Sequence, residues 1–274
     1  MEAHFIPTRS GARFCVHHPA DQTKSDGRGI VFLHAFAEEM NKSRHVVAQA
    51  SRGLASMGIG VLLIDLRGCG DSPGNFDDAS WEDWQDDVST AIDWMRARQY
   101  RQLALWGART GALLAAEAAA ARPDDIERCA LWQPTLSGDT YLTQFLRLRV
   151  ANAMLTGAKE PETTRGLRAR LESGETIEVA GYGLSPRMAA ALADRRLEQA
   201  RPRCPVDWFE VVPEQGAEAA LATQRVVAAW QAQQAQVQLH TVACEPFWGA
   251  SSTAELVQCP GLVNAMVDVA RTWR

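Results

Sequence analysis

A strand, a tight turn and a helix follow one another between residues 103 and 121, and this stretch constrains the fold more than any other. The apolar run at 103–106 is typical of a buried strand, and the alanine-rich tract at 112–121 is typical of a helix. Between them lies the sequence Gly-Ala-Arg-Thr-Gly, residues 107–111. Glycines on either side of one central residue permit a turn that side chains would block. Arg109 is therefore predicted to stand at the carboxyl end of the strand, where the helix begins.

Apolar runs of the buried-strand kind alternate with helical patterns through most of the 274 residues. An early hairpin is predicted at residues 5–18, and further strands at 29–33, 61–65, 103–106, 129–134, 206–212 and 237–242. Helices are predicted at residues 46–57, 81–98, 112–121, 217–235 and 259–273. Such alternation predicts an α/β protein with a mostly parallel central sheet flanked by helices.

The pattern changes between residues 135 and 201. Helical stretches at 141–154 and 186–200 surround a polar, hairpin-like piece at 177–183. We therefore predict a core domain formed by residues 1–134 and 202–274, with a cap-like insertion at 135–201. Within the insertion, Tyr141, Phe145 and Leu148 share one helical stripe, which is predicted to form the underside of the cap.

Composition and charge exclude several classes of protein. A formal net charge of -5 argues against a nucleic-acid partner, for which a basic face is expected. No apolar stretch approaches the ~20 residues of a membrane span. The first residues lack the basic and apolar regions of a signal peptide, so a cytoplasmic location is predicted.

The six cysteines are scattered, with no C-x-x-C motif and no histidine-rich stretch beside them. This spacing predicts reduced, mostly buried thiols rather than a disulfide framework or a metal site. We accordingly expect no bound metal and no cofactor.

The order of these features resembles the α/β-hydrolase fold over nearly the whole chain. His34-Ala-Phe stands in place of the oxyanion loop, Asp65-Leu-Arg-Gly-Cys-Gly-Asp-Ser follows the next strand, and the turn at Arg109 replaces the G-x-S-x-G nucleophile elbow. By this resemblance, Asp65 and Arg67 are expected to stabilise the turn that follows their strand.

A narrower resemblance rests on two segments, His34-Ala-Phe-Ala-Glu-Glu-Met-Asn-Lys-Ser-Arg44 and Trp106-Gly-Ala-Arg-Thr-Gly. Together they are similar to the exosortase A system-associated hydrolase 2 family. That resemblance implies a bacterial protein with a role in exopolysaccharide production and exosortase-linked protein sorting. It also implies a nominal ester or acyl hydrolase.

Two of the three triad positions of a serine hydrolase are not matched in the sequence. The elbow residue is Arg109, and a guanidinium that stays protonated cannot attack a carbonyl carbon. The acid position, after the strand ending at 212, offers Glu214. The segment after residue 242, where the catalytic histidine is expected, contains none, and His240 is predicted to be a packed strand residue. No catalytic residue is therefore assigned.

The rest of such a site is predicted to favour an anion. The backbone N–H of Thr110, a second N–H from the loop at 34–36 and the N-terminus of the helix at 112 should converge on one point. Arg109 adds positive charge there, which calls for an anionic partner. Glu38, Glu39 and Glu214 are candidates within the chain, and a ligand phosphate or carboxylate is another.

Three interpretations follow. In one, Arg109 pairs with a glutamate and the site is structural or inert. In another, Arg109 and the N–H groups bind a small anionic acyl, lipid or saccharide ligand. In the third, Glu38 and Glu39 act as an acid–base pair.

The oligomeric state is not predicted. The candidate ligand-binding residues are His34, Phe36, Glu38, Glu39, Arg109, Thr110 and Glu214.

Overall fold

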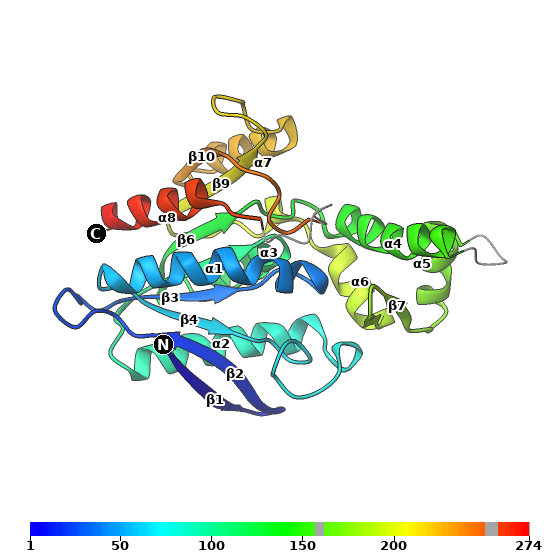
Figure 1. Ribbon diagram of the computed structural model, residues 1–274, viewed down its shortest axis with the longest axis horizontal. Coiled ribbons are helices and arrows are strands. Elements are labelled where there is room, and N and C mark those ends of the chain that lie inside the picture. The colour runs from blue at the N-terminus through cyan, green and yellow to red at the C-terminus, as the bar shows by residue number, and fades with distance from the viewer. Residues whose placement is uncertain (157–161, 250–256, 274) are drawn as a thin grey trace.

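An eight-stranded sheet forms the centre of the protein (Figure 1). The computed structural model describes residues 1–156, 162–249 and 257–273. The strands run in the order β1-β2-β4-β3-β5-β6-β9-β10. They are β1 (Glu2–Thr8), β2 (Gly11–His18), β3 (Arg28–Leu33), β4 (Gly60–Ile64), β5 (Gln102–Ala108), β6 (Ile126–Trp132), β9 (Val206–Val212) and β10 (Val237–Ala243). Pairing is antiparallel only where β1 meets β2 and β2 meets β4, so the predicted mostly parallel sheet is confirmed.

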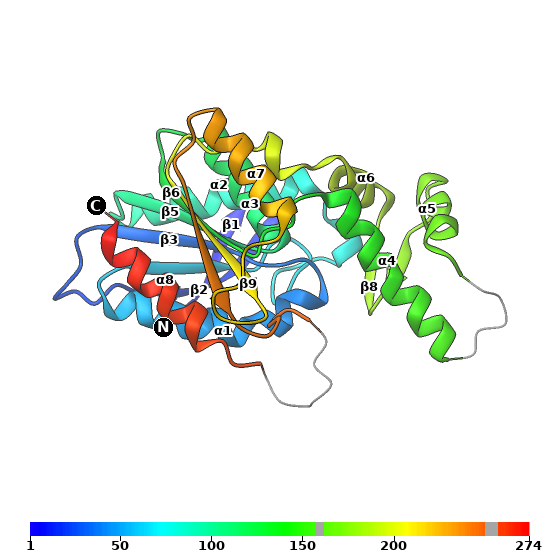
Figure 2. The same cartoon turned by 90° about the horizontal axis from the view of Figure 1, so that it is seen from above.

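Helices cover both faces of this sheet (Figure 2). One face carries α1 (Glu38–Ser56) and α8 (Pro260–Thr272), and the other carries α2 (Trp81–Ala97), α3 (Thr110–Ala121) and α7 (Leu221–Ala232). In α1, the buried residues Val46, Val47, Ala50 and Leu54 recur at helical spacing and pack on the sheet. The sheet is therefore buried on both sides, as its continuous apolar strands require.

The segment between β6 and β9 contributes no strand to the main sheet. It contains α4 (Gly138–Leu155), α5 (Thr164–Glu172), β7 (Ile177–Val179), β8 (Tyr182–Leu184), α6 (Pro186–Asp194) and the short helix η2 (Leu197–Gln199). Its two ends meet at a bridge between Ser137 and Arg196. These elements lie beyond the carboxyl ends of β3 and β6 (Figure 1). On α4, Tyr141 and Phe145 are buried as predicted, whereas Leu148 is exposed.

Helix α1 begins at Glu38, earlier than the predicted start at residue 46. Its first turns carry polar residues with no apolar stripe, so hydrophobic periodicity did not reveal them. Glu38 and Glu39 occupy the first turn, where the helix dipole favours carboxylates. The two glutamates that the sequence placed in a loop are thus held on a helix.

The prediction of six reduced cysteines was wrong for one pair. Cys244 and Cys259 form a disulfide, with their Cα atoms 5.7 Å apart, while the other four cysteines are free. Cys244 follows β10 and Cys259 caps the start of α8. The spacing of cysteines along the chain does not show that these two positions meet in space.

Close packing requires glycine at both positions that flank Arg109, Gly107 in β5 and Gly111 in α3. A Cβ atom on Gly111 would lie 2.2 Å from the carbonyl oxygen of Leu33 and 2.4 Å from that of His34. A Cβ on Gly107 would lie 2.4 Å from the carbonyl oxygen of Gly111. The start of α3 therefore packs directly on the end of β3 and on the end of its own strand.

Replacing Gly111 with alanine is expected to lower the free energy of unfolding by about 1–3 kcal/mol, because the added methyl meets backbone that cannot move aside. Urea unfolding measures this loss. Gly261→Ala is the matched control, since Gly261 also lies in a helix and a Cβ there would make only ordinary contacts with Val242 and Ala243 of β10. Equal stability of Gly111→Ala and the wild type would contradict the close approach of α3 and β3.

Candidate functional site

Arg109 occupies a strained turn between β5 and α3. Its backbone angles are φ 56° and ψ −117°, a region that residues with side chains rarely adopt. The turn is held by hydrogen bonds on both sides. The N–H of Arg109 donates to the carbonyl of Trp132 (2.9 Å), and its own carbonyl accepts from the N–H of Thr135 (3.0 Å). The turn presents the Arg109 side chain at the carboxyl edge of the sheet.

Two more strained residues lie at the same edge. Ala37, directly before α1, has φ 50° and ψ −127°, and Gln133, directly after β6, has φ 39°. With Arg109, they follow the neighbouring strands β3, β5 and β6. Backbone strain of this kind gathers at functional sites more than elsewhere. The amino ends of α1 and α3 are thereby brought to one edge of the sheet.

Glu39 is the partner of Arg109. The guanidinium donates through Nε to Oε2 of Glu39 (3.2 Å) and through Nη2 to Oε1 (3.3 Å), so the pair is bidentate. Nη1 donates to the carbonyl of Gln133 (3.2 Å), and the guanidinium carbon lies 4.7 Å from the ring centroid of Trp248. The side chains of Arg109 and Glu39 remain 13% and 11% exposed, so solvent still reaches the pair.

Burial changes the acid–base properties of this edge. It raises the pKa of Glu39, and the charge of Arg109 opposes that shift. Burial also raises the pKa of Glu38, whose Oε2 has no hydrogen-bond partner among the described residues. On the cap, burial and the nearby glutamates raise the pKa of Tyr141 well above its usual value. The site therefore holds two carboxyl groups that accept protons more readily than surface carboxylates do.

His34 and Phe36 support the loop that leads into α1. The Nε2 atom of His34 accepts from the N–H of Leu66 (3.3 Å), so its Nδ1–H donates to the carbonyl of Ala35 (2.8 Å). Burial lowers the pKa of His34, which keeps the ring neutral. Phe36 is buried among aromatic rings, which come from Phe76, Trp84, Tyr141 and Phe145. Both predicted site residues are committed to contacts within the protein.

The remaining predicted residues divide between the site and the surface. Thr110 follows the elbow residue, and its Oγ1 is buried with no hydrogen-bond partner in the described part of the chain. Glu214 lies exposed in the loop after β9, so the structure does not place it beside Arg109 as predicted. The first turn of α1 supplies the carboxylate that pairs with Arg109 instead. Gln133 was not among the predicted residues, and its position directly after a strand was its only signal.

His240 does not lie in a loop that reaches the elbow. Its Nε2 atom lies 3.1 Å from Oδ1 of Asp207, on the neighbouring strand β9. This contact confirms the predicted packed strand histidine. The buried acid farther along β9, Glu210, accepts from the hydroxyl of Thr223 (3.1 Å) and is likewise held within the fold.

Asp65 and Arg67 stabilise the turn after β4, as predicted. The carboxylate of Asp65 accepts from the N–H of Asp71 (3.0 Å) and from Nη2 of Arg44 (3.1 Å). Arg67 pairs with Asp83 on α2 (3.1 Å). The turn is thus tied to α1 on one side of the sheet and to α2 on the other.

A groove of about 850 Å³ opens next to the site, between the first turns of α1, the glycine-rich turn and the β7–β8 hairpin. Residues of both signs of charge and two aromatic rings line it. Its lining residues include Asn41, Arg44, Asp71, Phe76, Glu178 and Tyr182. The groove adjoins Ala37 and so lies against the turn that carries Glu38 and Glu39.

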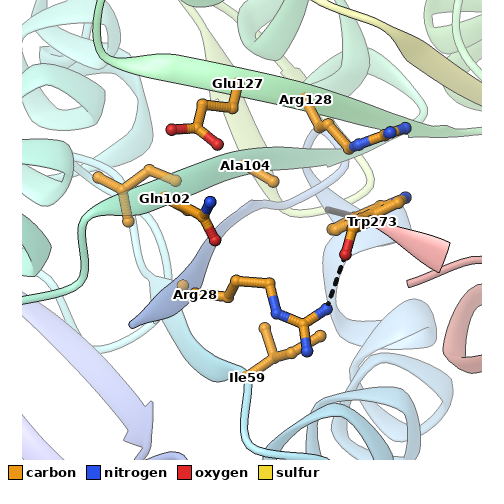
Figure 3. Close-up of a pocket in the computed structure, with 9 residues that line it drawn as sticks. Arg28, Ile59, Gln102, Ala104, Glu127, Arg128 and Trp273 are labelled. Atoms are coloured by element: carbon orange, nitrogen blue, oxygen red, sulfur yellow. Dashed lines mark hydrogen bonds between the residues drawn. The ribbon is translucent and has the colours of Figure 1, made fainter. Parts of the chain in front are cut away.

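A second, smaller pocket lies at the other end of the strands (Figure 3). Arg28 and Gln102, which begin β3 and β5, line it together with Trp273. The Arg28 guanidinium donates to the carbonyls of Trp273 (3.2 Å) and Ala270 (3.0 Å). This pocket therefore anchors the end of α8 and is separate from the site at Arg109.

Comparison with known families agrees with this geometry. Residues 26–192 match the family model described as serine aminopeptidase, S33. The chain belongs to this family. The matched range runs from β3 through the turn at Arg109 and most of the cap-like segment. No protein of curated function matches the sequence.

Solved structures show that the S33 chain has the α/β-hydrolase fold. Est1E from Butyrivibrio proteoclasticus with bound ferulic acid has 14% identity and a TM-score of 0.74, with 98% of each chain covered. XC6422 from Xanthomonas campestris, described as a serine hydrolase without a lid, has 16% identity and a TM-score of 0.59, covering 99% of this chain and 94% of that one. Proline iminopeptidase from Mycobacterium smegmatis has 14% identity and a TM-score of 0.59, covering 98% and 97%. At such identities the likeness extends to the fold alone.

Replacing Arg109 with serine is expected to leave the protein without appreciable esterase activity. The sequence holds no histidine after residue 240, and His240 is hydrogen-bonded to Asp207, so no base is placed to activate the new hydroxyl. Hydrolysis of p-nitrophenyl acetate and longer acyl esters measures this. Robust turnover by Arg109→Ser would show that a base reaches the elbow.

Proposed function

We propose that this chain is a non-hydrolytic binding protein of the S33 family, which holds a small anionic molecule at the former nucleophile elbow. The observation that carries the proposal is the partial exposure of Arg109 at the residue where a serine hydrolase has its nucleophile: its side chain is 13% exposed although it pairs with Glu39, the pairing that a structural or inert elbow also predicts. A guanidinium cannot serve as a nucleophile or as a base. It can bind a carboxylate, phosphate or sulfate through two parallel hydrogen bonds.

The surroundings of Arg109 support an anion. The amino ends of α1 and α3 lie at this edge, and helix amino ends favour negative charge. In this structure Glu39 pairs with the Arg109 guanidinium. The raised pKa of Glu39 reflects the cost of burying its carboxylate. The buried oxygens of Thr110 and Thr135 have no hydrogen-bond partner among the described residues, so their hydrogen-bonding capacity is unused. We infer that a ligand anion competes with Glu39 for Arg109.

The groove beside α1 supports a saccharide as the rest of the ligand. Carboxylate and amide groups of Asn41, Asp71 and Glu178 suit hydroxyl groups, while the half-buried Tyr182 offers a ring face for the apolar side of a sugar. The sequence resemblance to an exosortase-associated family is consistent with an exopolysaccharide intermediate. We therefore favour an acidic saccharide over an acyl chain or lipid.

The proposal includes a cytoplasmic site of action, which rests on the sequence. Within the described residues, no helix has both the length and the apolar character needed to cross a membrane. Est1E was solved with ferulic acid, which is consistent with a small molecule as the ligand of this fold. Hydrolysis of an ester or acyl group is the competing function. It would be supported if the wild-type protein hydrolysed such a substrate and replacement of Arg109 abolished that activity.

Binding of sulfate esters tests the proposal, because these probes keep their charge throughout the working pH range. Glucose 6-sulfate and octyl sulfate represent saccharide and acyl ligands, and isothermal titration calorimetry measures both. Glu39→Gln is expected to bind glucose 6-sulfate at least about tenfold more tightly than the wild type near neutral pH, since the competing charge is gone. The affinity of the wild type for glucose 6-sulfate should rise as the pH falls through the raised pKa of Glu39, because protonation removes the competing carboxylate charge. The affinity of Glu39→Gln should not change in this way.

Arg109→Gln is the matched variant that removes the guanidinium but keeps a polar side chain, and it is expected to lose binding. Equal affinity of Arg109→Gln and the wild type would overturn the proposal, as would failure of Glu39→Gln to bind either probe. Preference for octyl sulfate would keep the anion site but exclude the saccharide. Wild-type turnover of p-nitrophenyl esters that disappears in Arg109→Gln would favour the hydrolase instead.

A further inference from the structure

A cluster of two histidines and a glutamate lies on the N-terminal hairpin, away from the elbow. Glu2 and His4 are two residues apart on β1 and therefore share one face of the strand. His17, on β2, stands directly opposite Glu2 in the antiparallel register. The hairpin assembles this cluster on the side that packs against Trp94 of α2, although His17 is well separated in the sequence from the other two members.

The potential ligand atoms of the three side chains converge. Nε2 of His4 lies 3.3 Å from Oε2 of Glu2, and Nδ1 of His17 lies 3.4 Å from the same oxygen. All three groups offer an atom within 4.8 Å of the others. Zinc bonds of about 2.0–2.1 Å in a tetrahedron place neighbouring ligand atoms about 3.3 Å apart. The two measured separations fit that spacing.

Contacts behind the cluster hold the buried histidine in the orientation that a metal ligand needs. His17 is 5% exposed, and its other ring nitrogen, Nε2, lies 3.1 Å from the hydroxyl of Tyr100. A partner on the second nitrogen is the usual support of a metal-binding histidine, because it fixes the ring and leaves the first nitrogen free to coordinate. The rings of His4 and His17 also pack against Trp94, at centroid distances of 5.1 and 5.2 Å.

We propose that Glu2, His4 and His17 form a zinc site that joins the first two strands at the edge of the sheet. Two imidazole nitrogens and one carboxylate oxygen are a donor set that Zn²⁺ accepts. Glu2 is exposed, so water completes the coordination from the solvent side. The ion would tie β1, the edge strand, to β2. This proposal departs from the expectation, from the sequence, that the chain binds no metal.

The nearby charge of Arg98, whose guanidinium lies 3.4 Å from the Trp94 ring centroid, opposes a bound cation. With three protein ligands and this repulsion, we expect a dissociation constant on the order of 1–10 µM.

Metal binding is tested on the full-length, untagged protein after removal of metal with a chelator. Co²⁺ reports tetrahedral coordination through its visible absorption, and competition with Zn²⁺ gives the zinc affinity. One equivalent is expected to bind, and saturating Zn²⁺ is expected to raise the melting temperature by about 5 °C. Glu2→Gln and His4→Ala should each weaken zinc binding at least about tenfold.

Glu2 and His4 are the residues to replace first, because both are more exposed than His17 and their variants should fold. His45→Asn is the matched control, since it removes a histidine that lies on α1, outside the cluster. Unchanged zinc affinity in Glu2→Gln and His4→Ala would overturn the site. So would a wild type that binds no Co²⁺ or Zn²⁺ in the micromolar range, or an equal loss of affinity in His45→Asn.

Discussion

The interaction between Arg109 and Glu39 determines what the centre of this structure can do. A charged guanidinium at the nucleophile elbow requires a counter-charge, since an unpaired buried charge is costly. Glu39 supplies it from the first turn of α1, with two hydrogen bonds and limited exposure. We propose that a ligand anion can enter this ion pair. This is why we interpret the elbow as a binding site.

Strained and closely packed backbone segments bring Arg109 and Glu39 together. Ala37 and Arg109, at the amino ends of α1 and α3, both have positive φ angles. Gly111 lets α3 begin directly against the end of β3. The ends of two neighbouring parallel strands thus determine where the guanidinium and the carboxylate meet. The turn stands where the nucleophile elbow of an α/β-hydrolase lies, and in this chain it carries an arginine.

The sequence predicted the fold well because its signals are local. Apolar runs, helical spacing and the glycines around Arg109 each depend on a few neighbouring residues, and the sheet follows from their alternation. The partner of Arg109 depends on contacts between distant segments, so the sequence offered Glu38, Glu39 and Glu214 without choosing among them. The polar start of α1 concealed the helix that holds Glu39. The cluster of Glu2, His4 and His17 was missed because strand register, rather than motif spacing, assembles it.

A double-mutant cycle on the free energy of unfolding tests most directly whether Arg109 and Glu39 depend on each other. The variants are Arg109→Met, Glu39→Gln and the two combined, measured by urea unfolding at neutral pH. Each single change leaves the other group without its partner, so we expect a coupling energy of about 1–3 kcal/mol, with the double variant more stable than the sum of the single losses predicts. Losses that add to within about 0.5 kcal/mol would show that the two groups act independently. That result would contradict an elbow organised around this ion pair.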